Sequence, residues 1–92
     1  MLDRSKVSVI EQYLGRNFPG CQVEEEYAVG KSGQYLRIIK GTELRHHVLV
    51  IRGFLQDHTP KEILTLLTEW RVPEQIRMAG TVLVLITNRG VR

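Results

Sequence analysis

Two adjacent histidines are the residues of this sequence best suited to chemistry. His46 and His47 lie in the stretch RHHVLVIR, residues 45–52. A metal site needs its ligands on one side of a strand, at i and i+2, or on one side of a helix, at i and i+4. Neighbours on a strand instead point to opposite faces of the sheet. We therefore predict two structural histidines and neither a metal site nor a catalytic pair.

Other reactive side chains lack the partners that catalysis needs. Cys21 has no histidine at the spacing of a catalytic pair, and a thiol needs a base to become a nucleophile. The fragment GKS at residues 30–32 lacks the strand-to-helix context of a phosphate-binding loop. We predict a small buried residue at position 21, and a protein that is not an enzyme and holds no cofactor.

The composition is that of one ordinary globular domain. The chain has 92 residues, of which 42% are hydrophobic and 25% charged, which suits a single core. Its longest apolar runs, at 48–51 and 82–86, are too short for a bilayer, which takes roughly 20 residues. Residues 1–15 lack the apolar segment of a signal peptide, and one cysteine closes no disulfide within the chain. We expect a cytoplasmic protein without membrane partners.

The first half of the chain changes from a helical period to a strand period. Val7, Ile10 and Leu14 recur at the spacing of one helix face, before Gly15 and the stretch RNFPG end the helix. From Cys21 onward apolar residues alternate with polar ones, as in a half-buried strand. Glycine-containing turns then separate three predicted strands, at residues 21–29, 34–40 and 45–52. Such a succession predicts an antiparallel meander.

The second half contains the best-marked helix. Thr59-Pro60-Lys61-Glu62 combines a hydroxyl N-cap, a proline at the first helical position and a glutamate at N3. A shorter helix is predicted at 73–79, and the apolar stretch 81–87 predicts a buried strand. A strand–helix–strand unit is usually right-handed and parallel, so this strand should lie beside the third or near it.

The predicted fold is therefore α+β, a single domain over residues 1–92. Its elements follow the order α-β-β-β-α-β, and two main helices pack on a mixed four-stranded sheet. The sheet consists of the antiparallel meander and one C-terminal strand. The last residues, NRGVR, are expected to fray.

Tight turns would align two rows of residues across the meander. One face would carry Glu26, Arg37 and His47 in a row, a surface salt-bridge ladder. The other face would align Glu25 with Ile38 and His46. Because a buried charge needs a partner, Glu25 lies either at the rim of the core or in a polar pocket.

The second and third strands carry apolar residues on both faces. Beyond the residues that serve the core, the second face holds Tyr35, Ile39, Leu49 and Ile51. Either the helices cover both faces, or this face is an interface for a second copy or for a partner protein. The leading hypothesis is a non-enzymatic binding or interaction module that associates with itself or with a partner protein.

The second hypothesis is nucleic-acid binding. The formal net charge is only +3, and the acidic run at residues 24–26 favours dispersed, solvated charge instead. The candidate patch consists of basic residues around the second and third strands: Arg37, Lys40, Arg45, His47 and Arg52. Binding through such a patch would weaken with salt, since phosphate contacts release counterions.

The order of the elements resembles two known families. The first five elements resemble the double-stranded RNA-binding domain, which implies basic residues at the start of its last helix. Only Lys61 stands there.

The whole order resembles the core of the restriction-endonuclease-like nucleases, over nearly the full chain. That resemblance implies a metal held by an acid on the second strand and by acid-x-lysine on the third. Here QYLRIIK and RHHVLVIR contain no carboxylate, and Glu43-x-Arg45 lies at the turn with arginine in place of lysine. Glu11 stands where some members carry a helix glutamate, but one carboxylate does not hold the metal alone. The resemblance therefore implies a catalytically degenerate relative.

Overall fold

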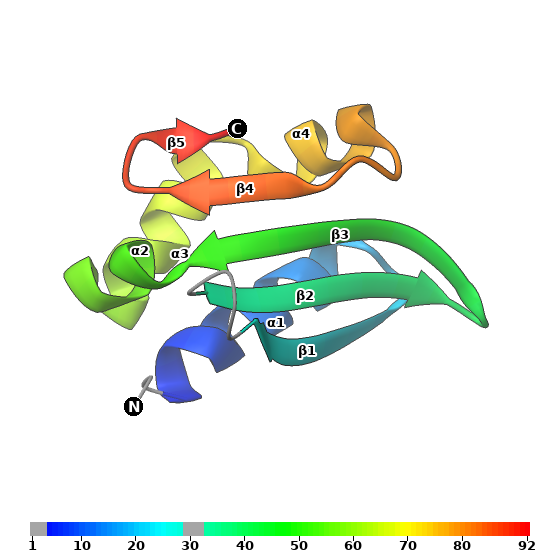
Figure 1. Ribbon diagram of the computed structural model, residues 1–92, viewed down its shortest axis with the longest axis horizontal. Coiled ribbons are helices and arrows are strands. Elements are labelled where there is room, and N and C mark those ends of the chain that lie inside the picture. The colour runs from blue at the N-terminus through cyan, green and yellow to red at the C-terminus, as the bar shows by residue number, and fades with distance from the viewer. Residues whose placement is uncertain (1–3, 29–32) are drawn as a thin grey trace.

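A mixed five-stranded sheet forms the scaffold of the structure (Figure 1). The computed structural model describes residues 4–28 and 33–92. The strands lie side by side in sequence order: β1 (Gln22–Ala28), β2 (Gly33–Lys40), β3 (Glu43–Ile51), β4 (Val84–Thr87) and β5 (Gly90–Val91). The β3–β4 pair is parallel and the other pairs are antiparallel. The predicted α+β fold is confirmed, with β4 parallel to β3 as expected.

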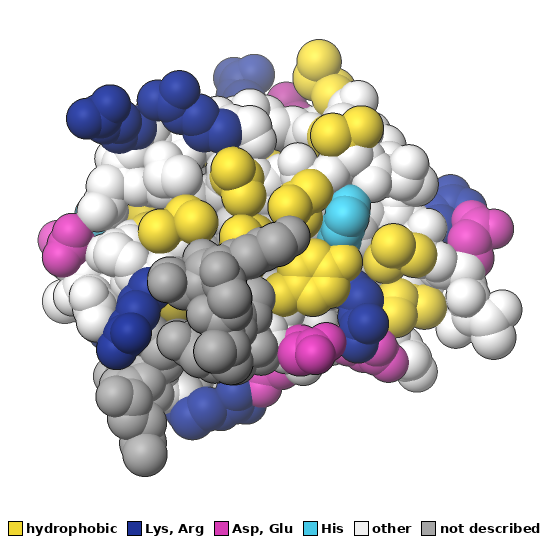
Figure 2. Space-filling model, viewed as in Figure 1, with side chains coloured by type: hydrophobic (Ala, Val, Ile, Leu, Met, Phe, Trp, Pro, Cys, Tyr) yellow, Lys and Arg dark blue, Asp and Glu magenta, His cyan; other side chains and the backbone are white. Residues whose placement is uncertain are grey.

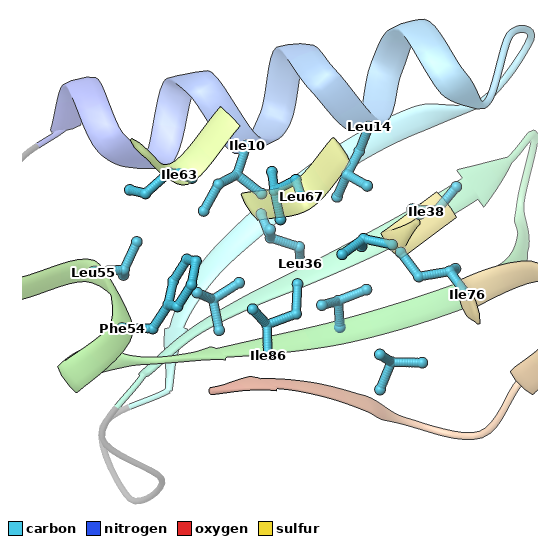
Figure 3. Packing of buried hydrophobic residues seen from close by; sticks show 14 of the residues in the cluster. Ile10, Leu14, Leu36, Ile38, Phe54, Leu55, Ile63, Leu67, Ile76 and Ile86 are labelled. Carbon is cyan, nitrogen blue, oxygen red and sulfur yellow. The ribbon is translucent and has the colours of Figure 1, made fainter. Parts of the chain in front are cut away.

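All the helices among the described residues lie on one face of this sheet (Figure 1). They are α1 (Arg4–Asn17), α2 (Arg52–Asp57), α3 (Pro60–Glu69) and α4 (Val72–Ala79). One buried cluster joins residues of every helix to residues from one side of the strands, such as Leu36, Ile38 and Ile86 (Figure 3). Of the two arrangements that the sequence left open, the structure has the one in which the helices leave the second face uncovered.

Local hydrogen bonds mark the start of α3 and the end of α1, the two longest of the described helices. The Thr59 hydroxyl accepts a hydrogen bond from the Glu62 amide at 3.1 Å, and the Glu62 carboxylate accepts one from the Thr59 amide at 2.8 Å. This capping box confirms the predicted start of α3. The helix α1 continues through Gly15 to Asn17, so Gly15 does not end it. The side-chain amide of Asn17 instead donates through Nδ2 to the carbonyl of Tyr13 at 2.8 Å in the last turn.

Two short elements were not predicted. The helix α2 begins at Arg52, which the sequence had placed at the end of a strand. The tail that was expected to fray pairs with β4 and adds the fifth strand. Leu85 and Arg92 exchange two backbone hydrogen bonds, of 3.0 and 2.8 Å. The pairing supplies partners for backbone groups that β4 would otherwise leave unpaired at the edge.

The registers of the meander are partly as predicted. Arg37 lies opposite His47, and Ile38 lies opposite His46. On β1, however, Glu24 lies opposite Arg37, because Ala28 pairs with Gly33. Residues 29–32, where the sequence predicted most of the connecting turn, lie outside the described residues. The predicted register was therefore wrong by two residues for β1, since a hairpin turn placed one residue away shifts every pair by two.

Candidate functional site

The face of the sheet away from the helices, called the open face below, carries the predicted apolar residues. Tyr35 lies opposite Leu49, and Leu49 lies beside Leu85 on the parallel strand β4. Tyr35, Ile51 and Leu85 are half-buried, whereas Leu49 is only 3% exposed. Figure 2 shows hydrophobic side chains in the middle of this face. The apolar band of the open face thus crosses three strands.

Charged residues stand at both ends of this apolar band. Glu26 lies opposite Tyr35 on the edge strand β1, and Arg92 lies opposite Leu85 beyond β4. Residues directly opposite one another in a sheet share a face. The five residues form what we call the central row: Glu26, Tyr35, Leu49, Leu85 and Arg92. Figure 2 shows acidic side chains on the β1 side of this view and basic ones near β5.

A second, polar row lies next to the central row. Glu24, Arg37 and His47 are neighbours across three strands. The Arg37 guanidinium lies 3.4 Å from the Glu24 carboxylate and 3.9 Å from that of Glu26. The prediction that Arg37 meets Glu26 on this face is thus confirmed as a contact, although the residue opposite Arg37 is Glu24.

His47 is held through both ring nitrogens. Its Nδ1 lies 2.7 Å from the Tyr35 hydroxyl, and its Nε2 lies 2.8 Å from the carbonyl oxygen of Thr81. Because a carbonyl only accepts, Nε2 donates to it, and Nδ1 of the neutral ring accepts from Tyr35. The ring therefore ties β3 to the segment that enters β4.

His46 points to the helix side, as predicted. Its Nδ1 donates to the carbonyl of Gly80 at 2.7 Å, and its ring centre lies 5.3 Å from that of Phe18. The two histidines thus leave opposite faces of β3 and bind separate carbonyls. The expectation that the two histidines point to opposite faces of the sheet is confirmed.

A basic cleft of about 420 Å³ lies on the helix side, where the end of α1, the β2–β3 hairpin and α4 meet. Its lining includes Lys40, Arg45 and Arg77 together with His46, and none of the described lining residues is acidic. Sequence reasoning missed Arg77, which no motif marks and which comes from a distant helix. The basic cleft is thus a second candidate site, separate from the open face.

A β-bulge explains how Arg45 and its neighbour His46 both line the basic cleft. The β2–β3 register shifts between Ile38 and Ile39, so that Leu44 pairs with Ile39 and Arg45 is the extra residue. A bulge interrupts the alternation that sends successive side chains to opposite faces. Cys21, predicted to be buried, is instead half-buried in the wall of this cleft.

The predicted nucleic-acid patch is divided by the fold. Lys40 and Arg45 line the basic cleft. Arg37 and His47 lie together on the open face, and Arg52 begins α2 at the other end of β3. The five residues therefore do not form one patch. They form two pairs, and Arg52 lies apart from both.

Glu25 lies at the rim of the helix-covered face with polar partners. It forms an ion pair with Arg4, and its side chain is 21% exposed. Burial, together with a hydrogen bond to Glu25 and its negative charge, raises the pKa of Glu11 to about 7. The same hydrogen bond and the Arg4 cation hold the pKa of Glu25 below its ordinary value. A proton on Glu11 supplies the donor that the buried oxygens Oε1 of Glu11 and Oε2 of Glu25 otherwise lack.

Comparisons with known proteins gave no match to a family model, a curated protein or a solved structure. Within residues 4–28 and 33–92, no three His, Cys, Asp or Glu side chains are grouped so that they could hold a metal ion. In the same ranges, no helix has the length and apolar character needed to cross a membrane. The open face and the basic cleft are the two candidate sites among the described residues.

Proposed function

We propose that the protein is a non-enzymatic interaction module that associates with a second copy of itself through the open face. The observation that carries this proposal is the central row, with its negative end, apolar middle and positive end. In the proposed dimer, a two-fold axis runs parallel to the strands and passes over Leu49, the middle residue of the row. The open faces of the two copies then meet, and their central rows run in opposite directions. Glu26 then faces Arg92 of the second copy, and Tyr35 faces Leu85 of the second copy.

Charge complementarity favours a second copy over an unrelated partner. An isologous interface brings each patch against its own symmetry mate, so a patch must complement itself. A row with opposite charges at its two ends meets this condition, because reversal pairs each acid with a base. The same charges would select against a copy docked in the unreversed orientation, in which like charges meet.

The open face also has suitable area and apolar content. The molecule measures 32 by 28 Å across the view of Figure 2, which accommodates the roughly 800 Å² per partner of a typical specific interface. Tyr35, Ile51 and Leu85 retain apolar area to bury, whereas Leu49 is already covered within the chain. The favourable free energy of association would therefore come mainly from the residues around Leu49.

The expected cytoplasmic location stays a prediction.

Sedimentation equilibrium tests self-association directly. The expected mass is about twice the 10.6 kDa of the chain, and Leu85→Lys should shift it to that of the monomer because it places a charge in the apolar band. Leu64→Lys is the matched control, since Leu64 is 38% exposed on α3, and it should leave the dimer intact. A native chain that stays monomeric at high concentration would contradict the proposal.

A charge exchange tests the two-fold arrangement. Glu26→Arg and Arg92→Glu should each weaken the dimer about fivefold, the effect expected of an exposed ion pair. The double variant should recover most of the loss, because each new arginine again faces a glutamate. Glu24→Arg is the control: it makes the same charge change beside Arg37, but its row does not end on a described basic residue. A double variant as weak as the single ones would rule out this arrangement.

A further inference from the structure

The basic cleft concentrates positive charge from three separate elements. Lys40 ends β2, Arg45 lies at the bulge of β3, and Arg77 lies in the last turn of α4. Glu43 contacts Arg45 at 2.7 Å and is not part of the lining. Like charges gathered around a hollow repel one another and create a field that attracts an anion.

The cations that line the cleft have more N–H donors than the contacts described for them use. Arg45 uses Nη1 for Glu43, and Arg77 uses Nη2 for the carbonyl oxygen of Asn17 at 2.6 Å. A guanidinium carries five N–H donors, so each arginine retains several. Lys40 is exposed at the mouth. Because the two guanidinium groups are already held by other partners, less conformational entropy is lost when a ligand binds.

The cleft also offers planar groups, which pack around the Phe18 side chain; Phe18 itself is only 7% exposed. The Arg77 guanidinium lies 4.8 Å from the centre of the Phe18 ring, and the His46 ring lies 5.3 Å from the same centre. Planar groups of this kind stack on nucleobases. The volume of about 420 Å³ falls within the range of small-molecule sites and exceeds what a bare phosphate ion would fill.

A second hollow shows that not every hollow on the surface is lined mainly by cations. It lies over α3, has the same volume of about 420 Å³, and is lined by Lys61 together with Glu62 and Glu69. Two glutamates outnumber one lysine there, whereas the described lining of the basic cleft has three cations and no acid. The two hollows therefore make a matched pair for experiment.

We infer that the basic cleft binds a nucleotide, with its phosphate between Lys40, Arg45 and Arg77 and its base against the half-buried His46 ring. The shared chemistry is a phosphate next to a planar ring, which free mononucleotides and single-stranded nucleic acid both supply. The site lies on the helix side of the sheet, so it does not depend on self-association through the open face.

Binding to AMP, to adenosine and to a short fluorescent oligothymidylate at low salt tests the inference. AMP or the oligonucleotide should bind, and adenosine should bind at least about tenfold more weakly because it lacks the phosphate. If the oligonucleotide binds more tightly than AMP and its affinity falls with salt, the source is nucleic acid. Equal or tighter binding of AMP identifies a mononucleotide.

Two pairs of variants separate the cleft from net charge. Lys40→Gln and Arg45→Gln should each weaken binding of the better phosphate probe about fivefold to tenfold, because each removes a charged donor. Lys61→Gln and Arg52→Gln make the same charge changes away from the cleft and should alter binding by less than about twofold. Unchanged melting temperatures would show that the variants are folded. Arg77 is left unchanged because it also binds the end of α1.

Three outcomes would overturn the inference. One is the absence of binding by both phosphate probes. A second is adenosine binding as tight as that of AMP, which would remove the role of the phosphate. The third is an equal loss of affinity in the control variants, which would indicate attraction by net charge alone.

Discussion

The two faces of β3 differ although both are apolar. On the helix-covered face, Val48 and Val50 are fully buried in a cluster that includes all four helices. On the open face, Leu49 lies between half-buried neighbours in a row that ends in a glutamate and an arginine. Burial alone is enough to make the first face stable. The charges that flank the second face would give an orientation to the apolar contact proposed for it.

Truncation of the core should have the largest effect on stability. Leu36→Ala on the helix-covered face should reduce the free energy of unfolding by about 2–5 kcal/mol, because it leaves a cavity in a packed core. Leu85→Ala on the open face should cost less than about 1 kcal/mol, since the surroundings there are open to water. Urea denaturation at low protein concentration, where self-association contributes least, measures both. Equal losses would mean that the open face is packed as a second core.

The acid pair at the edge of the covered face should make stability depend on pH. The pKa of Glu11 is raised in the folded state from 4.5 to about 7, so the folded chain holds its proton more tightly than the unfolded chain. Stability should therefore fall as pH rises from about 4.5 to 7 and then level off. The total loss is at most about 3 kcal/mol, and smaller to the extent that solvent reaches the pair.

Glu11→Gln isolates this effect. The amide donates to Glu25 at any pH, so this variant should be more stable than the native chain at pH 8 and should lose the decline between pH 5 and 7. Thermal melts across this range measure the difference. Glu69→Gln, the same charge change on exposed α3, should retain the decline. A decline that persists in Glu11→Gln would assign it to other groups.

Removing the hydroxyl group of one tyrosine on each face compares the hydrogen bonds of the two faces. Tyr35→Phe leaves His47 Nδ1 without its donor at 2.7 Å and should cost about 0.5–1.5 kcal/mol. Tyr13→Phe on the helix side removes a longer contact of 3.4 Å to the carbonyl of Leu67 and should cost less. Chemical denaturation of the two variants gives the comparison. The reverse order would show that the Tyr35–His47 contact is weak in solution.

The polar row should contribute least. A double-mutant cycle on Arg37 and Glu24, whose charged groups are 3.4 Å apart, should give a coupling of about 0.2–1 kcal/mol, because both side chains are partly exposed. The corresponding cycle with Glu26, at 3.9 Å, should give a smaller value. Added salt should reduce both couplings. Couplings that are large and insensitive to salt would mean that this row is shielded from solvent, as in an interface.

Local sequence patterns predicted the longer elements and the register of β2 with β3, but not the register of β1. The capping box at Thr59 and the stripe of Val7, Ile10 and Leu14 act within one helix turn or two, so they are readable without the rest of the chain. The register of β1 depends on where the turn before β2 falls, which shifts every pair at once. The prediction therefore placed the wrong glutamate opposite Arg37.

The sequence by itself determined that His46 and His47 point in opposite directions, that the fourth strand is parallel, and that α1, α3 and α4 are helices. Each of these features follows from backbone periodicity, from a local cap or from the handedness of a strand–helix–strand unit. Only the tertiary structure decided that all four helices share one face, which leaves the apolar band open. It also decided that a bulge brings Arg45 to the same cleft as His46 and that Arg77 joins them from α4. These features depend on contacts between residues far apart in the chain, and such contacts leave no periodic signal in the sequence.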